Sequence, residues 1–66
     1  METGMRIGQY LTDNGIKQTF ITENTGLPAV VVSAMVNGKR KIRVDEYYKI
    51  CKALNVPLET FLEEGA

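Results

Sequence analysis

Apolar residues recur at helical spacing along most of the chain, and glycine, asparagine or proline marks each break between the apolar segments. Ile7, Tyr10 and Leu11 stand at positions i, i+3 and i+4, which place them on one face of a helix. We expect this helix over residues 5–14. Gly15 ends it, because glycine readily takes the left-handed conformation that often follows a helix.

A second, shorter helix is predicted over residues 17–24, where Phe20 and Ile21 supply the apolar positions. Gly26 terminates this helix for the same conformational reason as Gly15. A last helical turn or two is predicted over residues 58–63, with Phe61 and Leu62 pointing inward.

Residues 29–36, AVVVSAMV, read at first like a β-strand because three valines stand in a row. A strand here would need polar alternation or burial on both faces, and the chain offers no partner strand. Pro28 instead suits the first turn of a helix. Asn37-Gly38 could form a hairpin turn, but residues 39–43, KRKIR, lack the apolar alternation of a returning strand, so we expect Asn37-Gly38 to end a helix. This helix has an inner side of Val32, Met35 and Val36, an outer side of Ala29, Val30, Ser33 and Ala34, and Val31 on the flank.

A strong helix is predicted over residues 44–54. Asp45 and Glu46 stand in its first turn and Lys52 in its last, as the helix dipole prefers. Its predicted apolar stripe is Val44, Tyr47, Tyr48, Cys51 and Leu54. The sequence therefore predicts five short helices in one all-α domain that spans residues 1–66.

The amino-acid composition excludes several kinds of functional site. The 66 residues include one cysteine, Cys51, and no histidine, so a disulfide framework, a histidine metal site and a histidine base are all excluded. No apolar run approaches the roughly 18 residues of a membrane span. We expect a cytoplasmic protein that is not an enzyme and needs no metal, cofactor or small-molecule ligand, with Cys51 buried in the core.

Charge is balanced overall but concentrated locally. Eight Lys and Arg offset eight Asp and Glu, yet residues 37–43, NGKRKIR, hold four cations and no acid. Such a run is commonly only a solvated loop. A local charge of +4 nevertheless favours contact with a polyanion.

The combination of motifs resembles a known family. Gly15-Ile16-Lys17-Gln18, Ile21-Thr22, Gly26-Leu27, Asn37-Gly38-Lys39 and Lys52-Ala53-Leu54-Asn55-Val56 occur in the order found in the lambda-repressor-like group, which includes Cro and the compact phage and bacterial repressors. The resemblance covers about residues 5–62. It implies a compact five-helix domain with a helix-turn-helix in its second and third helices, encoded by a prokaryote or a phage, which binds operator DNA as a homodimer.

The resemblance also implies roles for individual residues. The positions that face base edges in the major groove correspond to Ala29, Val30, Ser33 and Ala34. Phosphate contacts are expected from Lys17, Gln18, Asn37, Lys39, Arg40, Lys41 and Arg43. The dimer interface is expected near the last two helices, with Tyr47, Val56, Leu58 and Phe61 as candidates.

Two departures from the family pattern bear on function. Leu11 and Val36 occupy positions where the family often pairs an arginine with a glutamate, so an apolar contact replaces an ion pair. The base-facing positions carry only one hydrogen-bonding side chain, Ser33, and cannot make bidentate contacts to purines. Two readings stay open: the apolar face reads thymine methyls and DNA shape, or it docks a protein, as in an antirepressor or an assembly factor.

Overall fold

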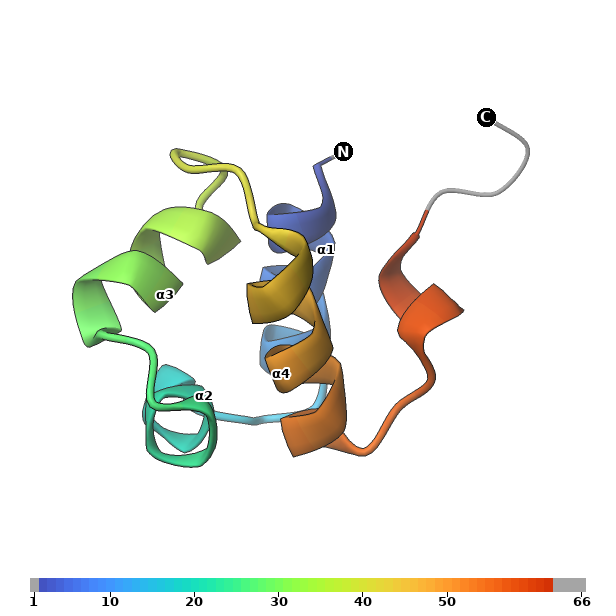
Figure 1. Cartoon of the computed structure of the whole chain (residues 1–66). Helices are drawn as coiled ribbons and strands as arrows, with labels where there is room; N and C mark the ends of the chain where they lie inside the picture. Colours follow the sequence, from blue (N-terminus) through green and yellow to red (C-terminus); the bar gives the residue numbers. More distant parts are fainter. Residues whose placement is uncertain (1, 63–66) are drawn as a thin grey trace.

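The computed structural model describes residues 2–62 and consists of four α-helices and a closing turn of 3-10 helix (Figure 1). The elements are α1 (Thr3–Asp13), α2 (Gln18–Thr25), α3 (Ala29–Val36), α4 (Val44–Leu54) and η1 (Leu58–Phe61). The described residues contain no strand, so the all-α prediction and the helical assignment of residues 29–36 are confirmed. The predicted fifth helix is a single 3-10 turn, and Glu63, its expected end, lies outside the described residues.

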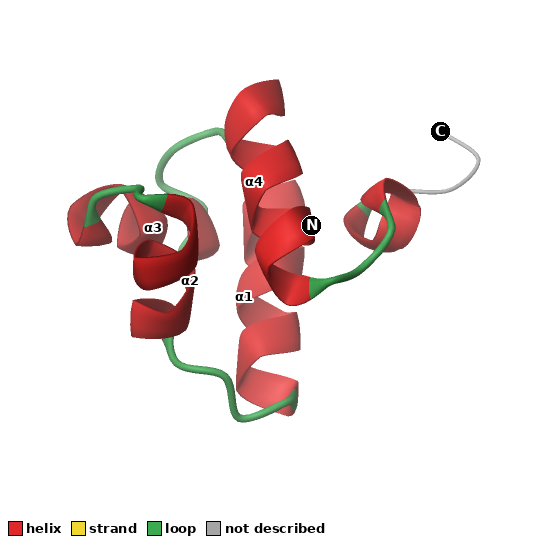
Figure 2. Ribbon diagram, turned by 60° about the horizontal axis from the view of Figure 1, so that its bottom comes forward, coloured by secondary structure: helices red, strands yellow, loops and turns green. Residues whose placement is uncertain are grey.

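The helices pack against one another in pairs. Helix α2 packs against both α3 and α4, and α1 packs against α3, while η1 contacts α1 and α4. Figures 1 and 2 both show η1 on the opposite side of α1 and α4 from the pair α2–α3. No helix within residues 2–62 is long and apolar enough to cross a membrane.

The core largely follows the predicted helix faces. It consists of Ile7, Leu11, Ile21, Val32, Met35, Tyr47, Ile50, Cys51 and Phe61. The inner side predicted for α3 is confirmed, and so is the burial of Cys51, whose thiol pKa is raised by burial. Of the two apolar residues in α2, Ile21 is buried whereas Phe20 is 40% exposed.

The prediction was wrong at three apolar positions near the chain's end. Val44 is 87% exposed, Tyr48 is 51% exposed and Leu62 is 48% exposed. The buried stripe of α4 is centred on Tyr47, Ile50 and Cys51, so Tyr48 lies about 100° around the helix from Tyr47. Val44 shares the direction of the stripe, but it is the first residue of α4 and lies at the edge of the core.

The predicted breaks between helices are confirmed in their backbone geometry. Gly15, Gly26 and Gly38 all have positive φ. Gly26 closes α2 by donating its N–H to the Thr22 carbonyl at 3.0 Å, and its φ of 77° sets the turn between α2 and α3. Pro28 lies one position earlier than expected. It caps α3 rather than entering its first turn, and its carbonyl accepts the N–H groups of Val31 and Val32.

Helices α1 and α3 approach so closely that only glycine fits between them. A Cβ on Gly4 would lie 2.2 Å from the Met35 carbonyl oxygen, and one on Gly8 would lie 2.9 Å from that of Val36. Both distances are shorter than any real contact, so a side chain at either position would push α3 away from α1. The sequence analysis missed this contact, which fixes the position of α3 on the domain.

Three aromatic rings fasten η1 to the rest of the domain. The Phe61 ring meets the Tyr10 and Tyr47 rings edge to face, with centroids 5.3 and 6.4 Å away. The Tyr47 hydroxyl donates a hydrogen bond to the Leu58 carbonyl and accepts one from the Phe61 N–H at 3.4 Å. Burial raises the pKa of this phenol, which keeps it a neutral donor.

Gly4→Ala should destabilise the domain by about 1–3 kcal/mol, the typical cost of forcing extra volume into a packed interface. This loss should exceed the gain in helix propensity of about 0.5–1 kcal/mol. Urea unfolding followed by circular dichroism measures the difference. Thr12→Ala is the control, because Thr12 is an exposed residue of the same helix, and its effect should stay within about 0.5 kcal/mol. Equal stability of Gly4→Ala and the parent protein would show that the steric cost is no larger than the gain in helix propensity, which would contradict a contact that only glycine permits.

Candidate nucleic-acid interface

The outer side of α3 is an apolar, solvent-facing surface. Val30 is 76% exposed and Ala29 is exposed, whereas Ser33, Ala34 and Val31 are half-buried. The burial pattern confirms the two predicted sides of the helix. All four predicted base-facing residues therefore lie on surface that a partner can reach.

The loop between α3 and α4 is organised by a single carboxylate, that of Glu46. Its two oxygens accept hydrogen bonds from Arg40 Nη1 at 2.8 Å and Nη2 at 3.0 Å. Its Oε1 also accepts the backbone N–H of Arg43 at 2.9 Å, which satisfies the start of α4 as in one half of a capping box. Glu46 is only 7% exposed, so the loop folds back onto a nearly buried anion.

The geometry shifts the ionisation of both partners. The hydrogen bonds from Arg40 lower the pKa of the Glu46 carboxyl, and the Arg43 N–H lowers it further, although burial acts in the opposite direction. The bond to Glu46 correspondingly raises the pKa of Arg40. Sequence analysis missed this role of Glu46. Its signal was the spacing, because Glu46 stands three residues after the helix cap, where a capping glutamate belongs.

The predicted phosphate-binding cations of this loop fall into two classes. Arg40 is committed to Glu46, and Arg43 lies 3.4 Å from Asp45 in an exposed ion pair. Lys39 and Lys41 are exposed and form no ion pair with any described residue. The two lysines therefore carry the loop's unneutralised charge, and Ile42 between them and α4 anchors the loop by packing against the core.

The N-terminus of α2 has no side-chain cap and no acidic residue to balance the helix dipole. Its cap residue is Lys17, whose side chain offers no acceptor for the free N–H groups, and the first turn contains no acidic residue. A cation at this end opposes the helix dipole, whereas an anion there is favoured by both the dipole and the N–H groups. Lys17 and Gln18 are both exposed, as a phosphate contact requires.

An open hollow of about 410 Å³ brings two of the predicted phosphate contacts together. Gln18 from the start of α2 and Asn37 from the end of α3 both line it. Leu11 and Val36, the pair that replaces the family's ion pair, lie in the same hollow. Both side chains therefore border the same hollow, and the apolar contact between them stays a prediction.

Of the four residues predicted for a dimer interface, two are buried in the core and two are at least partly exposed. Tyr47 and Phe61 are 9% and 3% exposed, so they belong to the core of one protomer rather than to a surface. Leu58 is 48% exposed and Val56 is half-buried. An open apolar groove of about 430 Å³ runs beside Leu58, and its lining includes Thr3, Ile42, Val44, Tyr48 and Leu62.

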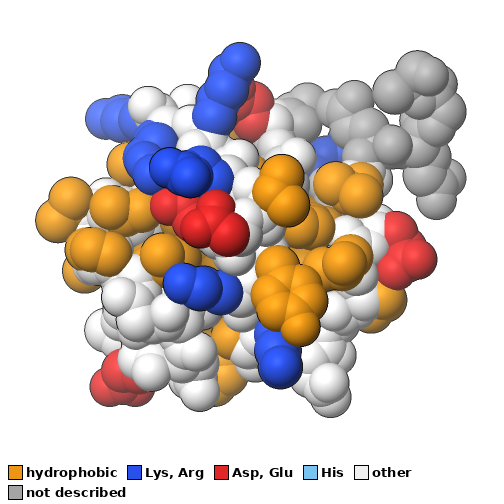
Figure 3. Space-filling model, in the orientation of Figure 1, with side chains coloured by type: hydrophobic (Ala, Val, Ile, Leu, Met, Phe, Trp, Pro, Cys, Tyr) orange, Lys and Arg blue, Asp and Glu red, His pale blue; other side chains and the backbone are white. Residues whose placement is uncertain are grey.

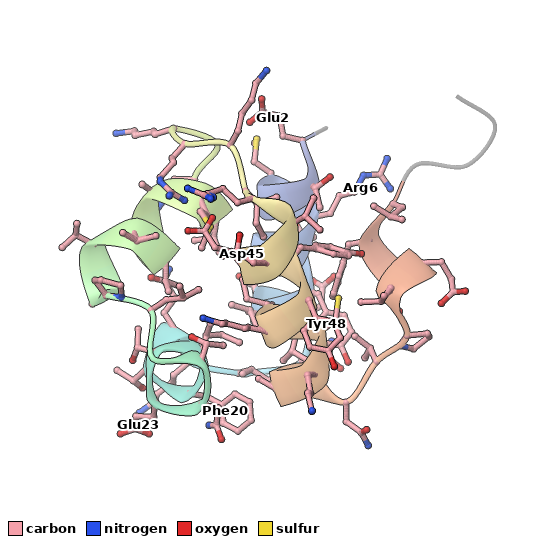
Figure 4. All side chains as sticks on the ribbon, viewed as in Figure 1. Glu2, Arg6, Phe20, Glu23, Asp45 and Tyr48 are labelled. Carbon is pink, nitrogen blue, oxygen red and sulfur yellow. The ribbon has the colours of Figure 1, made fainter. Side chains whose placement is uncertain are left out.

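We call Val44, Tyr48, Leu58 and Leu62 the α4–η1 patch. Figure 3 shows apolar side chains gathered over α4 and η1, separate from the apolar side chains over α3 and the basic loop beside it. Tyr48, labelled in Figure 4, projects from α4 toward η1. Three of the four patch residues were expected to point inward or to form the apolar stripe, so sequence analysis misplaced them rather than overlooked them.

Glu46→Gln should lower the melting temperature at pH 7 by several degrees, because the amide cannot replace the charged bond to Arg40. The folded-state pKa of Glu46 is lowered, so its stabilisation is present above the unfolded pKa and is lost as pH falls through the folded pKa. The difference between variant and parent should therefore begin to shrink as pH falls to about 4, the ordinary range of a glutamate pKa, and should vanish only below the lowered folded-state pKa. Thermal unfolding of both proteins at several pH values measures this difference in melting temperature.

Asp45→Asn serves as the matched control for Glu46→Gln. It makes the same acid-to-amide change in the same helical turn, but its ion pair with Arg43 is exposed on both sides. Exposed pairs contribute little, so the effect at pH 7 should be much smaller. A gap between Glu46→Gln and the parent that stays constant from pH 7 to pH 2 would contradict the assigned role of Glu46.

Comparison with known proteins places these features in one family. The model of the Cro/C1-type HTH DNA-binding domain matches residues 6–63, nearly the whole chain. Comparison with curated proteins and with solved structures gave no match. The described residues include no group of three or more His, Cys, Asp or Glu side chains that could hold a metal ion. With helices α2 and α3 joined through the turn at Gly26, the chain belongs to the Cro/C1-type helix-turn-helix DNA-binding domains.

Proposed function

We propose that this protein is a sequence-specific transcriptional regulator of the Cro and phage-repressor type, which binds operator DNA as a homodimer. The recognition helix is α3, and it acts by binding rather than by catalysis. One observation carries the proposal: the exposed face of α3 lies beside the basic loop (Figure 3). DNA offers a groove for the helix and phosphates for the loop.

Phosphate contacts are assigned on both sides of α3. Lys39 and Lys41 follow the helix and are free of ion pairs with the described residues. Lys17 and Gln18 stand at the α2 N-terminus, whose free N–H groups suit an anion. Arg40 contributes mainly through the loop, since two of its N–H groups are held by Glu46. Asn37 and Arg43 complete the phosphate-binding set.

The α4–η1 patch is the proposed dimer interface, with a second copy of the chain as its occupant. Leu58, one of the residues predicted for the interface, lies within this patch. Val56 follows the C-terminal end of α4 and lines a hollow together with Tyr48 and Leu58. An exposed cluster of valine, tyrosine and two leucines is the composition of an interface core rather than of ordinary surface. The same patch on two protomers can meet around a two-fold axis, which matches the two half-sites of an operator.

Lys39→Ala and Lys41→Ala should each weaken binding to any duplex and reduce the steepness of its salt dependence. Each lysine that contacts a phosphate adds about one unit to the slope of log K against log salt, per protomer. Fluorescence anisotropy titrations at four salt concentrations measure this slope.

Lys52→Ala is the control for the loop lysines. Lys52 lies in the last turn of α4, roughly 12 Å along the helix from the basic loop, and its ammonium sits 5.8 Å from the Tyr48 ring centre. Its removal should leave the salt slope unchanged. A slope that falls equally for Lys52→Ala and Lys39→Ala would show only a general charge effect and would count against a phosphate-binding loop.

Two exposed valines test the separation of the DNA and dimer surfaces. Val44→Asp should give a monomer by sedimentation, because it places a charge in the α4–η1 patch. Helix stability should not suffer, since an acidic residue suits the first position of α4. Val30→Asp should keep the dimer but abolish DNA binding by repelling phosphates. The reverse pattern, or a dimeric Val44→Asp, would overturn the assignment of the two surfaces.

The same variants address a second candidate function, a protein-docking role for α3. Its support is the 76% exposure of Val30, which a protein partner could also cover. If Val30→Asp binds duplex DNA as the parent does but loses a protein complex, α3 serves protein recognition and the proposed operator binding is wrong.

A further inference from the structure

The outer side of α3 offers almost nothing that can hydrogen-bond to a base. Ala29, Val30 and Ala34 have no polar side-chain atom, and Ser33 contributes one hydroxyl. Asn37, at the end of the helix, uses its amide group within the helix itself: Nδ2 donates to the Ser33 carbonyl at 2.8 Å and lies 3.5 Å from the Ser33 hydroxyl. The polar groups nearest the face are therefore partly engaged.

The major groove presents one apolar feature, the 5-methyl group of thymine. Guanine and adenine present hydrogen-bond donors and acceptors there, and cytosine presents its amino donor and a C5 hydrogen in place of the methyl group. We propose that α3 selects its DNA by the thymine methyl groups of the operator, with Val30 as the principal reading residue. This inference rests on the proposed function, because it assumes that α3 enters the major groove.

Discrimination on this surface has two sources. A thymine methyl packed against a valine gains the free energy of burying one apolar carbon, which corresponds to about four-fold in affinity per methyl. A guanine or cytosine edge packed against the same valine loses water and gains no hydrogen bond in return, which is unfavourable. Thymine is therefore favoured and G·C pairs are disfavoured by the same side chains.

Val30 is suited to this task by its exposure and its stiffness. It is 76% exposed, the most of any large apolar residue on α3. A valine in a helix holds essentially one χ1 rotamer, so little side-chain entropy is lost when it packs against a methyl group. The contacts of Gly4 and Gly8 with the end of α3 fix the helix that carries it.

Charge next to the face identifies DNA rather than an apolar partner as its occupant. Lys39 and Lys41 are exposed directly after α3 and form no ion pair with the described residues. The uncapped N-terminus of α2, with Lys17, precedes α3 in the chain. An apolar strip that is followed directly by unneutralised cations complements a groove lined by methyl groups and bordered by phosphates.

The test begins with selection of tight-binding duplexes from a random pool by the full-length protein. The chosen duplex is then synthesised with deoxyuridine in place of thymidine, first throughout and then at single positions. Uracil keeps every hydrogen-bonding group of thymine and lacks only the methyl. We expect loss of about four-fold per contacted methyl at a small number of positions, while the salt slope, which reports phosphate contacts, stays the same.

Two variants assign the methyl contacts to α3. Val30→Ala should shrink the ratio of affinities between the thymine and uracil duplexes, because it removes the side chain that meets the methyl. Lys39→Ala should weaken both duplexes equally and leave their ratio unchanged. Both residues are exposed, so neither change removes a core contact.

The outcomes separate this inference from the function on which it rests. Salt-sensitive binding with equal affinity for thymine and uracil duplexes would overturn methyl reading and leave DNA binding intact. A uracil effect that Val30→Ala does not change would place the reading residue elsewhere and also overturn the inference. Absence of salt-sensitive binding to any duplex would sink both the inference and the proposed function.

Discussion

The close contact between α1 and α3 determines where α3 lies and which side of it is exposed to solvent. At Gly4 and Gly8 the two backbones approach to a distance that no side chain would permit. The inner side of α3 therefore packs against the domain, with Val32 and Met35 buried. The outer side of α3 is exposed as a consequence. A recognition helix needs this rigidity, because an apolar surface has no directional hydrogen bonds to correct a misplaced approach.

The basic loop shows a second use of internal contacts to prepare a surface. Glu46 accepts hydrogen bonds from Arg40 and from the Arg43 N–H, so one carboxylate both neutralises one cation of the loop and fixes the loop's path. Lys39 and Lys41 keep their charge without ion pairs among the described residues. The four cations thus divide between two arginines that are paired with acidic side chains and two lysines that form no ion pair with the described residues. A count of charges along the sequence cannot make this distinction.

Sequence analysis succeeded where the signal is local. Helical spacing placed Ile7, Leu11, Val32 and Met35 in the core, and the glycines marked the helix ends, because both depend on neighbouring residues only. It failed where the answer depends on which elements meet. Gly4 looks like an ordinary helix residue until α3 lies against it, and Val44 looks like a core residue until the core is seen to end before it. The base-facing side of α3 was placed correctly as a surface, but its partner is not encoded in the spacing.

An apolar recognition face also gives a physical reason for the proposed dimer. If each methyl contributes about four-fold and a half-site presents three of them, one protomer prefers its site by only about 60-fold. A symmetric dimer contacts two half-sites, so the preference is squared to roughly 4,000-fold, which reaches the lower range of specific DNA binding. Under the proposed function, weak individual contacts on α3 therefore make the α4–η1 patch, as the proposed dimer interface, necessary for specific binding. The less each helix can discriminate between bases, the more sequence-specific binding depends on a second recognition helix, which the proposed dimer would hold at a fixed distance from the first.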